Sequence, residues 1–228
     1  MTVELVAAAL LIAVPITFNV AFFELGRTFD YPKILREPAD VILRRFDAGG
    51  SGLVLRWQLL LTSAVAMLPL VALVGVALAA PTELTVSGIV IGSAAAIVQA
   101  LGLVRWPFAV PELARRYVAA DEPTTREAIE VVFATLHRLL GVGIGEHLGY
   151  LLTGAWTIIV AVSVASTDVM PQWLGWLGVP IGVALLIGSL EFVGPSERNG
   201  WSVAGMIVPI AYIAWSLWLI SLGLALIL

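Results

Sequence analysis

Long apolar stretches dominate this sequence. Each reaches or exceeds the ~20 residues that an α-helix needs to cross the hydrocarbon core of a membrane. Hydrophobic residues make up 60% of the 228 positions and charged residues only 12%, whereas a soluble domain is about half apolar and about a quarter charged. The sequence therefore predicts an all-α polytopic membrane protein, a single integral membrane domain over residues 1–228 with six transmembrane helices in a bundle. The predicted spans are residues 3–24, 53–80, 86–108, 139–165, 173–193 and 202–227.

The basic residues predict the orientation of this bundle. All 12 Lys and Arg residues fall within, or at the edges of, three of the segments that separate the spans, residues 25–52, 109–138 and 194–201. Cytoplasmic loops of membrane proteins are enriched in Lys and Arg. These three segments are therefore predicted to be cytoplasmic, which leaves the N-terminus and the C-terminus both extracytoplasmic.

The first cytoplasmic segment contains the pattern of a short helix. Pro38 suits the first turn of a helix, apolar residues recur over 41–46, and Gly49-Gly50 would end it. A helix of this kind, with basic residues beside an apolar face, is expected to lie on the membrane surface.

Polar side chains enter the spans mainly near their cytoplasmic ends, and the deepest titratable ones, Glu146 and His147, lie in the fourth span. An ionised side chain at mid-membrane costs about 2.5–3.5 kcal/mol, so Glu146 needs a partner, water or a proton. We therefore predict a cytoplasm-facing polar vestibule. In the alternative interpretation, Glu146 and Arg105 form a buried pair that only fixes the bundle. The candidate ligand-binding residues are Glu146, His147, Arg105, Tyr150, Glu191 and Arg56.

Small residues recur every four positions in the fourth span, at Gly141, Gly145 and Gly149. Such a stripe allows a second helix to approach closely. These glycines are therefore predicted to pack helices rather than to bind a ligand. The second helix could also belong to a partner protein.

Metal and cofactor chemistry has little support in the sequence. There is no cysteine, and adjacent residues such as Glu146 and His147 point about 100° apart on a helix. The other histidine, His137, lies on a different face. No metal site and no cofactor is predicted, and a haem with His147 as its axial ligand is the less favoured alternative. A net charge of −4 without a basic face argues against nucleic-acid binding.

Tryptophans occur near both ends of the predicted spans. Trp57, Trp106 and Trp201 are expected at the cytoplasmic interface, and Trp173 and Trp176 at the outer one. Aromatic belts of this kind mark the membrane–water boundary.

Four short strings occur in order along the chain: Phe29-Asp30-Tyr31-Pro32, Arg105-Trp106-Pro107-Phe108, Gly145-Glu146-His147-Leu148-Gly149-Tyr150 and Trp173-Leu174-Gly175-Trp176-Leu177-Gly178. As an ordered set they resemble a bacterial family of small multi-pass membrane proteins catalogued as a domain of unknown function, number 4386. The resemblance implies a full-length, single-domain membrane protein, which we expect in the bacterial plasma (inner) membrane. It transfers no activity, cofactor or catalytic residue.

Three functions remain open at this point. The preferred hypothesis is binding of a lipid or a small amphiphilic or polar ligand in the vestibule, which the deep ionisable residues favour. The alternative is a non-catalytic accessory or assembly subunit that contacts a membrane-protein partner or forms a homo-oligomer. A small-solute transporter has less support, because paired broken helices are not evident. Enzymatic activity is not favoured, since no catalytic motif is present.

Overall fold

Helices account for most of residues 2–228, the part of the chain that the computed structural model describes, and no strand occurs among them. The predicted all-α fold is therefore confirmed. The elements in order are α1 (Val3–Phe29), η1 (Lys33–Arg36), α2 (Ala39–Ala77), α3 (Thr82–Ala119), α4 (Pro123–Leu136), η2 (His137–Leu148), α5 (Gly149–Ala165), α6 (Gln172–Gly188), η3 (Gly194–Ser196) and α7 (Ser202–Ile227).

Five helical segments are long and apolar enough to cross a membrane. They are α1, α2, α3, α7 and the continuous run Pro123–Ala165, in which α4, η2 and α5 follow one another without a break. The fifth predicted span corresponds to α6, an apolar helix of 17 residues, which at 1.5 Å per residue is about 26 Å long. Helix length and composition thus identify an integral membrane protein.

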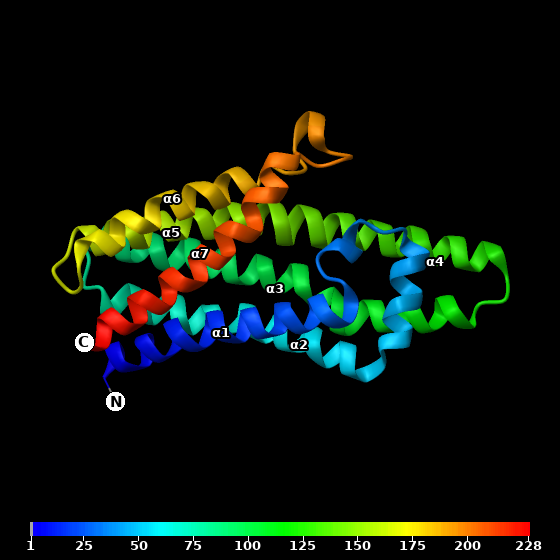
Figure 1. The fold of residues 1–228 in the computed structure, drawn as a ribbon, viewed down its shortest axis with the longest axis horizontal. Helices are drawn as coiled ribbons and strands as arrows, with labels where there is room; N and C mark the ends of the chain where they lie inside the picture. The colour runs from blue at the N-terminus through cyan, green and yellow to red at the C-terminus, as the bar shows by residue number, and fades with distance from the viewer. Residues whose placement is uncertain (1) are drawn as a thin grey trace.

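The helices form an elongated bundle with both termini at the same end (Figure 1). At the opposite end α3 and α4 form a hairpin that extends past the other helices (Figure 1). There the first turns of α2 run across the long axis of the bundle (Figure 1). The chain turns into the bundle at Gly50, whose φ of 54° and ψ of −155° suit glycine alone.

The hydrophobic core is divided into two clusters along the bundle. One lies toward the termini, and the other packs around Leu25 and Trp106 at the far half. On α3 the buried members of the first cluster end at Ala96, and those of the second begin at Trp106. The intervening turns of α3 carry Gln99 and Arg105. Polar groups therefore occupy the layer between the two apolar clusters.

Trp57 and Trp106 do not face the lipid as residues of an aromatic belt would, because both are buried inside the bundle. Their exposed fractions are 0% and 1%, and their rings stack with centroids 4.3 Å apart and planes 8° apart. The two indoles bury each other between α2 and α3, and Phe29 packs edge-on against both. The other predicted belt residues, Trp173, Trp176 and Trp201, are exposed.

The continuous helical run Pro123–Ala165, which contains α4 and α5, changes to a π-helix over His137–Leu148. All three glycines of the predicted stripe lie against α3. A Cβ added at Gly102 would lie 2.6 Å from the Cα of Gly145, and one added at Gly141 would lie 2.5 Å from Nη2 of Arg105. A Cβ at Gly149 would likewise contact an α3 side chain. π-Helical turns are rare and often occur at functional sites.

Candidate functional site

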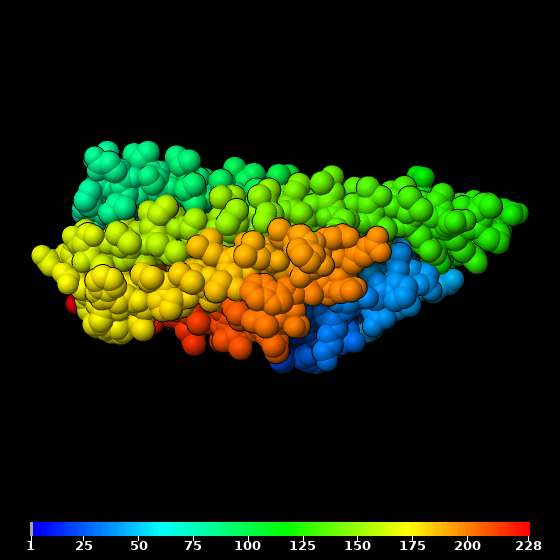
Figure 2. Space-filling view, turned by 90° about the horizontal axis from the view of Figure 1, so that it is seen from above, coloured from blue at the N-terminus to red at the C-terminus, as the bar shows by residue number. Residues whose placement is uncertain are grey.

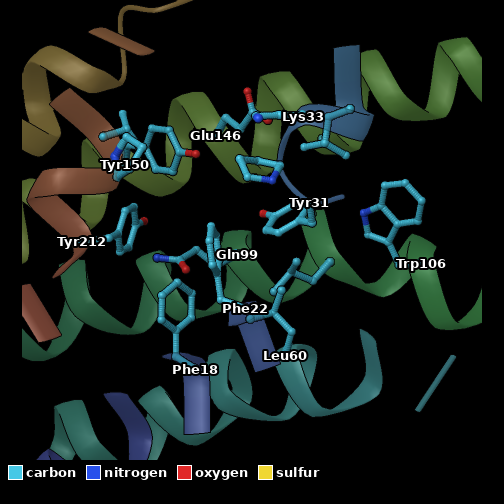
Figure 3. A pocket seen from close by; sticks show the side chains of 18 of the residues that line it. Phe18, Phe22, Tyr31, Lys33, Leu60, Gln99, Trp106, Glu146, Tyr150 and Tyr212 are labelled. Atoms are coloured by element: carbon cyan, nitrogen blue, oxygen red, sulfur yellow. The ribbon is translucent and has the colours of Figure 1, made fainter. Parts of the chain in front are cut away.

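A cavity of about 500 Å³ lies between α1, α3, η2 and α7, under the connection that joins α1 to α2. Figure 3 shows polar and aromatic side chains from all of these segments converging on it. Cavities of about 300–1,000 Å³ are typical of small-molecule sites. The volume is therefore sufficient for a small ligand or for part of a lipid.

The connection after α1 folds back over the cavity instead of continuing away from the bundle. Helix α1 ends at Phe29, and Asp30 adopts a left-handed conformation with φ of 64° while its N–H bonds to the carbonyl oxygen of Leu25. Asp tolerates this conformation better than most residues. The reversal brings Tyr31 and Lys33 to the cavity (Figure 3). Burial raises the pKa of Tyr31 to about 12, so its phenol stays protonated at neutral pH.

One arginine of this connection joins two carboxylates from distant parts of the chain. Nη2 of Arg36 lies 3.6 Å from Oε2 of Glu146 and 3.3 Å from Oε1 of Glu191. In Figure 2 the segment around η3 meets the segment that contains η1 on the surface of the bundle. The ion-pair partner of Glu146 is therefore Arg36, and the pairing of Glu146 with Arg105 that the alternative interpretation required does not occur.

Arg105 lines the same cavity but has different surroundings. Its exposed fraction is 5%, its Nη1 donates a hydrogen bond to the carbonyl oxygen of Gly102, and its Cζ lies 5.1 Å from the ring centroid of Trp106. Within residues 2–228 no carboxylate oxygen lies within 4.0 Å of its nitrogens, and its Nε has no acceptor. Arg105 is thus a buried cation without an ionic partner.

Aromatic and amide side chains complete the walls of the cavity. The ring of Tyr212 stacks on Phe18 with centroids 5.6 Å apart and meets Tyr150 edge-on at 5.5 Å. Gln99 Nε2 donates to Oγ1 of Thr153 at 2.6 Å. In Figure 3 Gln99 lies between the tyrosines and Phe22. A charged end and an aromatic middle therefore share one continuous space.

Four of the six predicted ligand-binding residues line this cavity, namely Glu146, Arg105, Tyr150 and Glu191. The other two face elsewhere. His147 Nδ1 donates to the carbonyl oxygen of Ser189 at 2.7 Å, because it is turned away from its neighbour around the helix. Arg56 pairs with Glu24, with Nε 3.5 Å from Oε2.

Sequence reasoning missed Arg36, Lys33, Tyr31 and Tyr212 as cavity residues. The first three lie outside the predicted spans, whereas the prediction rested on polar groups at membrane depth. The string Phe29-Asp30-Tyr31-Pro32 was nevertheless distinctive. Asp30 with Pro32 two residues later is a turn signal that could have predicted the reversal.

No group of three or more His, Asp or Glu side chains within residues 2–228 is arranged to hold a metal ion. No residue is therefore assigned as a metal ligand.

Fold and site together define a multi-helix integral membrane protein with a polar, aromatic-walled cavity. The chain belongs to the family described as Domain of unknown function (DUF4386), whose family profile matches residues 6–223. No curated protein matches the chain in a search by sequence, and no solved structure matches it.

Proposed function

We propose that this protein binds a lipid or another small amphiphile in the cavity between α1 and α7. The observation that carries the proposal is the cavity itself, in which the Arg36–Glu146–Glu191 cluster adjoins a wall of aromatic rings. An amphiphile has a polar head for the first part and an apolar chain for the second. A purely polar solute would leave the aromatic wall unused.

Helices α1 and α7 diverge along the bundle, and this supports entry of a ligand into the cavity from the side, out of the bilayer. Helices α1 and α7 touch where Asn19 Nδ2 donates to Oγ of Ser216 at 2.9 Å. They separate farther along, where α7 starts beside Glu191 and α1 ends in the far cluster (Figure 1). Phe23 and Ile213 line the cavity and are 63% and 58% exposed. An opening bordered by exposed apolar side chains favours a ligand that arrives from lipid.

The charge distribution supports placing the charged end of the cavity toward the cytoplasm. All 12 Lys and Arg residues lie within or beside the segments that we predict to be cytoplasmic, and both termini lie at the opposite end of the bundle (Figure 1). The positive-inside rule then gives extracytoplasmic termini. In this orientation six helices, α6 included, cross the plasma membrane of a bacterium.

The alternative function, an accessory or assembly subunit, has less support in the structure than in the sequence. The glycine stripe that favoured a protein partner packs against α3 of the same chain. The stripe is therefore already used within the bundle. The third candidate, a small-solute transporter, has no separate observation in its favour.

Native mass spectrometry of the protein extracted gently from its own membranes tests the proposal. Val208 on α7 lines the cavity and is nearly buried, and the Val208→Trp variant would fill the space. Ile210→Trp on the same helix is the matched control, because Ile210 is exposed. We expect a bound amphiphile on the wild type and on Ile210→Trp, and its loss from Val208→Trp. Equal lipid binding by all three proteins would refute the proposal.

A further inference from the structure

We infer that Arg105 is the anion-binding residue of the cavity and that the bound amphiphile carries a phosphate or carboxylate head. This inference rests on the proposed function, since it names the ligand class of the same cavity. The observation behind it is a guanidinium that is 5% exposed, lines the cavity, and has no carboxylate within 4.0 Å among residues 2–228.

A buried charge without a partner is unfavourable in a protein interior. In a membrane protein the neighbouring lipid gives no compensation, so ionisable side chains at depth commonly mark ligand or ion sites. Arg105 satisfies only part of its hydrogen-bonding capacity. Nη1 donates to the carbonyl oxygen of Gly102, whereas Nε has no acceptor within residues 2–228. The remaining donors can serve an anion that enters the cavity.

The surroundings hold the guanidinium in a fixed plane. Gly141 packs directly against it, since an added Cβ there would lie 2.5 Å from Nη2 and 2.9 Å from Cζ. Trp106 approaches it from α3 itself. A planar guanidinium that is held in place offers parallel N–H donors to a phosphate or a carboxylate. The glycine therefore leaves room for the guanidinium beside the cavity.

The charge balance of the lining also favours an anion over a cation. The two carboxylates, Glu146 and Glu191, are both within ion-pair distance of Arg36. Lys33 lines the cavity as well, and within residues 2–228 it forms no ion pair. One arginine cannot neutralise both carboxylates, but with Lys33 and Arg105 the five charged residues of the lining carry a net charge of +1, and this positive balance favours an anion.

A charge series on a constant hydrocarbon chain tests the inference. The protein is held in a nonionic maltoside detergent, and native mass spectrometry measures the binding of dodecyl phosphate, dodecanoate, dodecanol and dodecyltrimethylammonium. We expect both anions to bind about tenfold more tightly than dodecanol, because hydrogen bonds to charged groups are stronger than neutral ones. Arg105→Gln should reduce this preference to less than about threefold. Arg115→Gln, on the same helix but exposed and paired with Glu112, should retain it.

The outcomes separate this inference from the proposed function. If dodecanol or the ammonium compound binds as tightly as the anions, the anion assignment is wrong while amphiphile binding stands. If none of the four compounds binds, both are wrong. If inorganic phosphate competes as well as dodecyl phosphate, the ligand is a soluble anion and not an amphiphile. The series on the wild type decides these cases even if Arg105→Gln fails to fold, and Arg105→Lys then tests whether charge alone restores binding.

Discussion

The carboxylate of Glu146 lies 3.6 Å from the guanidinium of Arg36, although one belongs to the π-helical part of a membrane-crossing helix and the other to the connection after α1. The pair attaches this connection to the bundle at the edge of the cavity. Because the same connection carries Tyr31 and Lys33 to the cavity, the ion pair also links Glu146 to the segment that covers the site.

This pairing predicts a measurable coupling between Arg36 and Glu146. In a double-mutant cycle with Arg36→Gln and Glu146→Gln, we expect a coupling free energy of about 0.5–1 kcal/mol, kept small because the Arg36 side chain is 47% exposed. The free energy of unfolding can be followed by tryptophan fluorescence during titration with dodecyl sulfate. The exposed pair Arg115 and Glu112 serves as control and should give less. Strictly additive effects of the two substitutions would contradict the pairing.

A second prediction concerns the contact between Gly102 and Gly145. Replacing Gly102 by Ala places a Cβ 2.6 Å from the Cα of Gly145, and backbone atoms there cannot move aside as a flexible side chain would. We expect a loss of about 1–3 kcal/mol in unfolding free energy. Gly143→Ala in the same π-helix is the control, because its nearest neighbour is 3.6 Å away. A neutral Gly102→Ala would show that α3 and η2 are not packed so closely.

The stacked indoles of Trp57 and Trp106 give a third prediction. Trp106→Ala removes a fully buried ring and should lower the unfolding free energy by about 3–5 kcal/mol. Trp176→Ala removes a ring that is exposed at the periphery and should have a much smaller effect. Chemical denaturation of both variants in the same detergent provides the comparison. Similar losses in the two proteins would contradict the burial of Trp106 inside the bundle.

The half-buried phenol of Tyr31, which lines the cavity, gives a prediction about pH. Burial raises its pKa to about 12, so the folded protein holds the phenolic proton more tightly than the unfolded chain does. The resulting stabilisation is present below pH ~10 and is lost as the pH rises toward 12. Phenolate absorbance at 295 nm, taken as the difference between wild type and Tyr31→Phe, should have its midpoint near 12. A midpoint near 10 would mean that Tyr31 is open to water.

Apolar length was sufficient to predict much of the fold. Runs of apolar residues specify membrane-crossing helices because lipid offers no other partner for backbone polar groups. Hydropathy does not, however, specify where a helix stops. Helix α1 continues to Phe29, and α6 ends at Gly188, in both cases at a turn whose position depends on local backbone bonds. The burial of Trp57 and Trp106 could not be predicted from their positions along the spans, because each ring is covered by the other.

The candidate site was only partly predictable, and the reason is topological. Glu146, Arg105, Tyr150 and Glu191 were identified by depth in the membrane, and the structure brings them to one cavity. Arg36 and Tyr31 reach the cavity because the chain reverses at Asp30. The hydrophobic periodicity of the sequence does not predict this reversal. His147 and Arg56 lie at a suitable depth, but their side chains do not point into the cavity. Each binds a partner outside it.

Photoaffinity mapping can show whether an anionic amphiphile binds in the cavity. A diazirine-bearing dodecyl phosphate is activated on the protein in nonionic detergent, and the labelled residues are located by peptide mass spectrometry. We expect saturable labelling of cavity residues such as Phe18, Phe22 and Tyr212, and excess unlabelled dodecyl phosphate should abolish it. Labelling spread evenly over exposed positions such as Ile210 and Met206, and unaffected by the competitor, would contradict binding in the cavity.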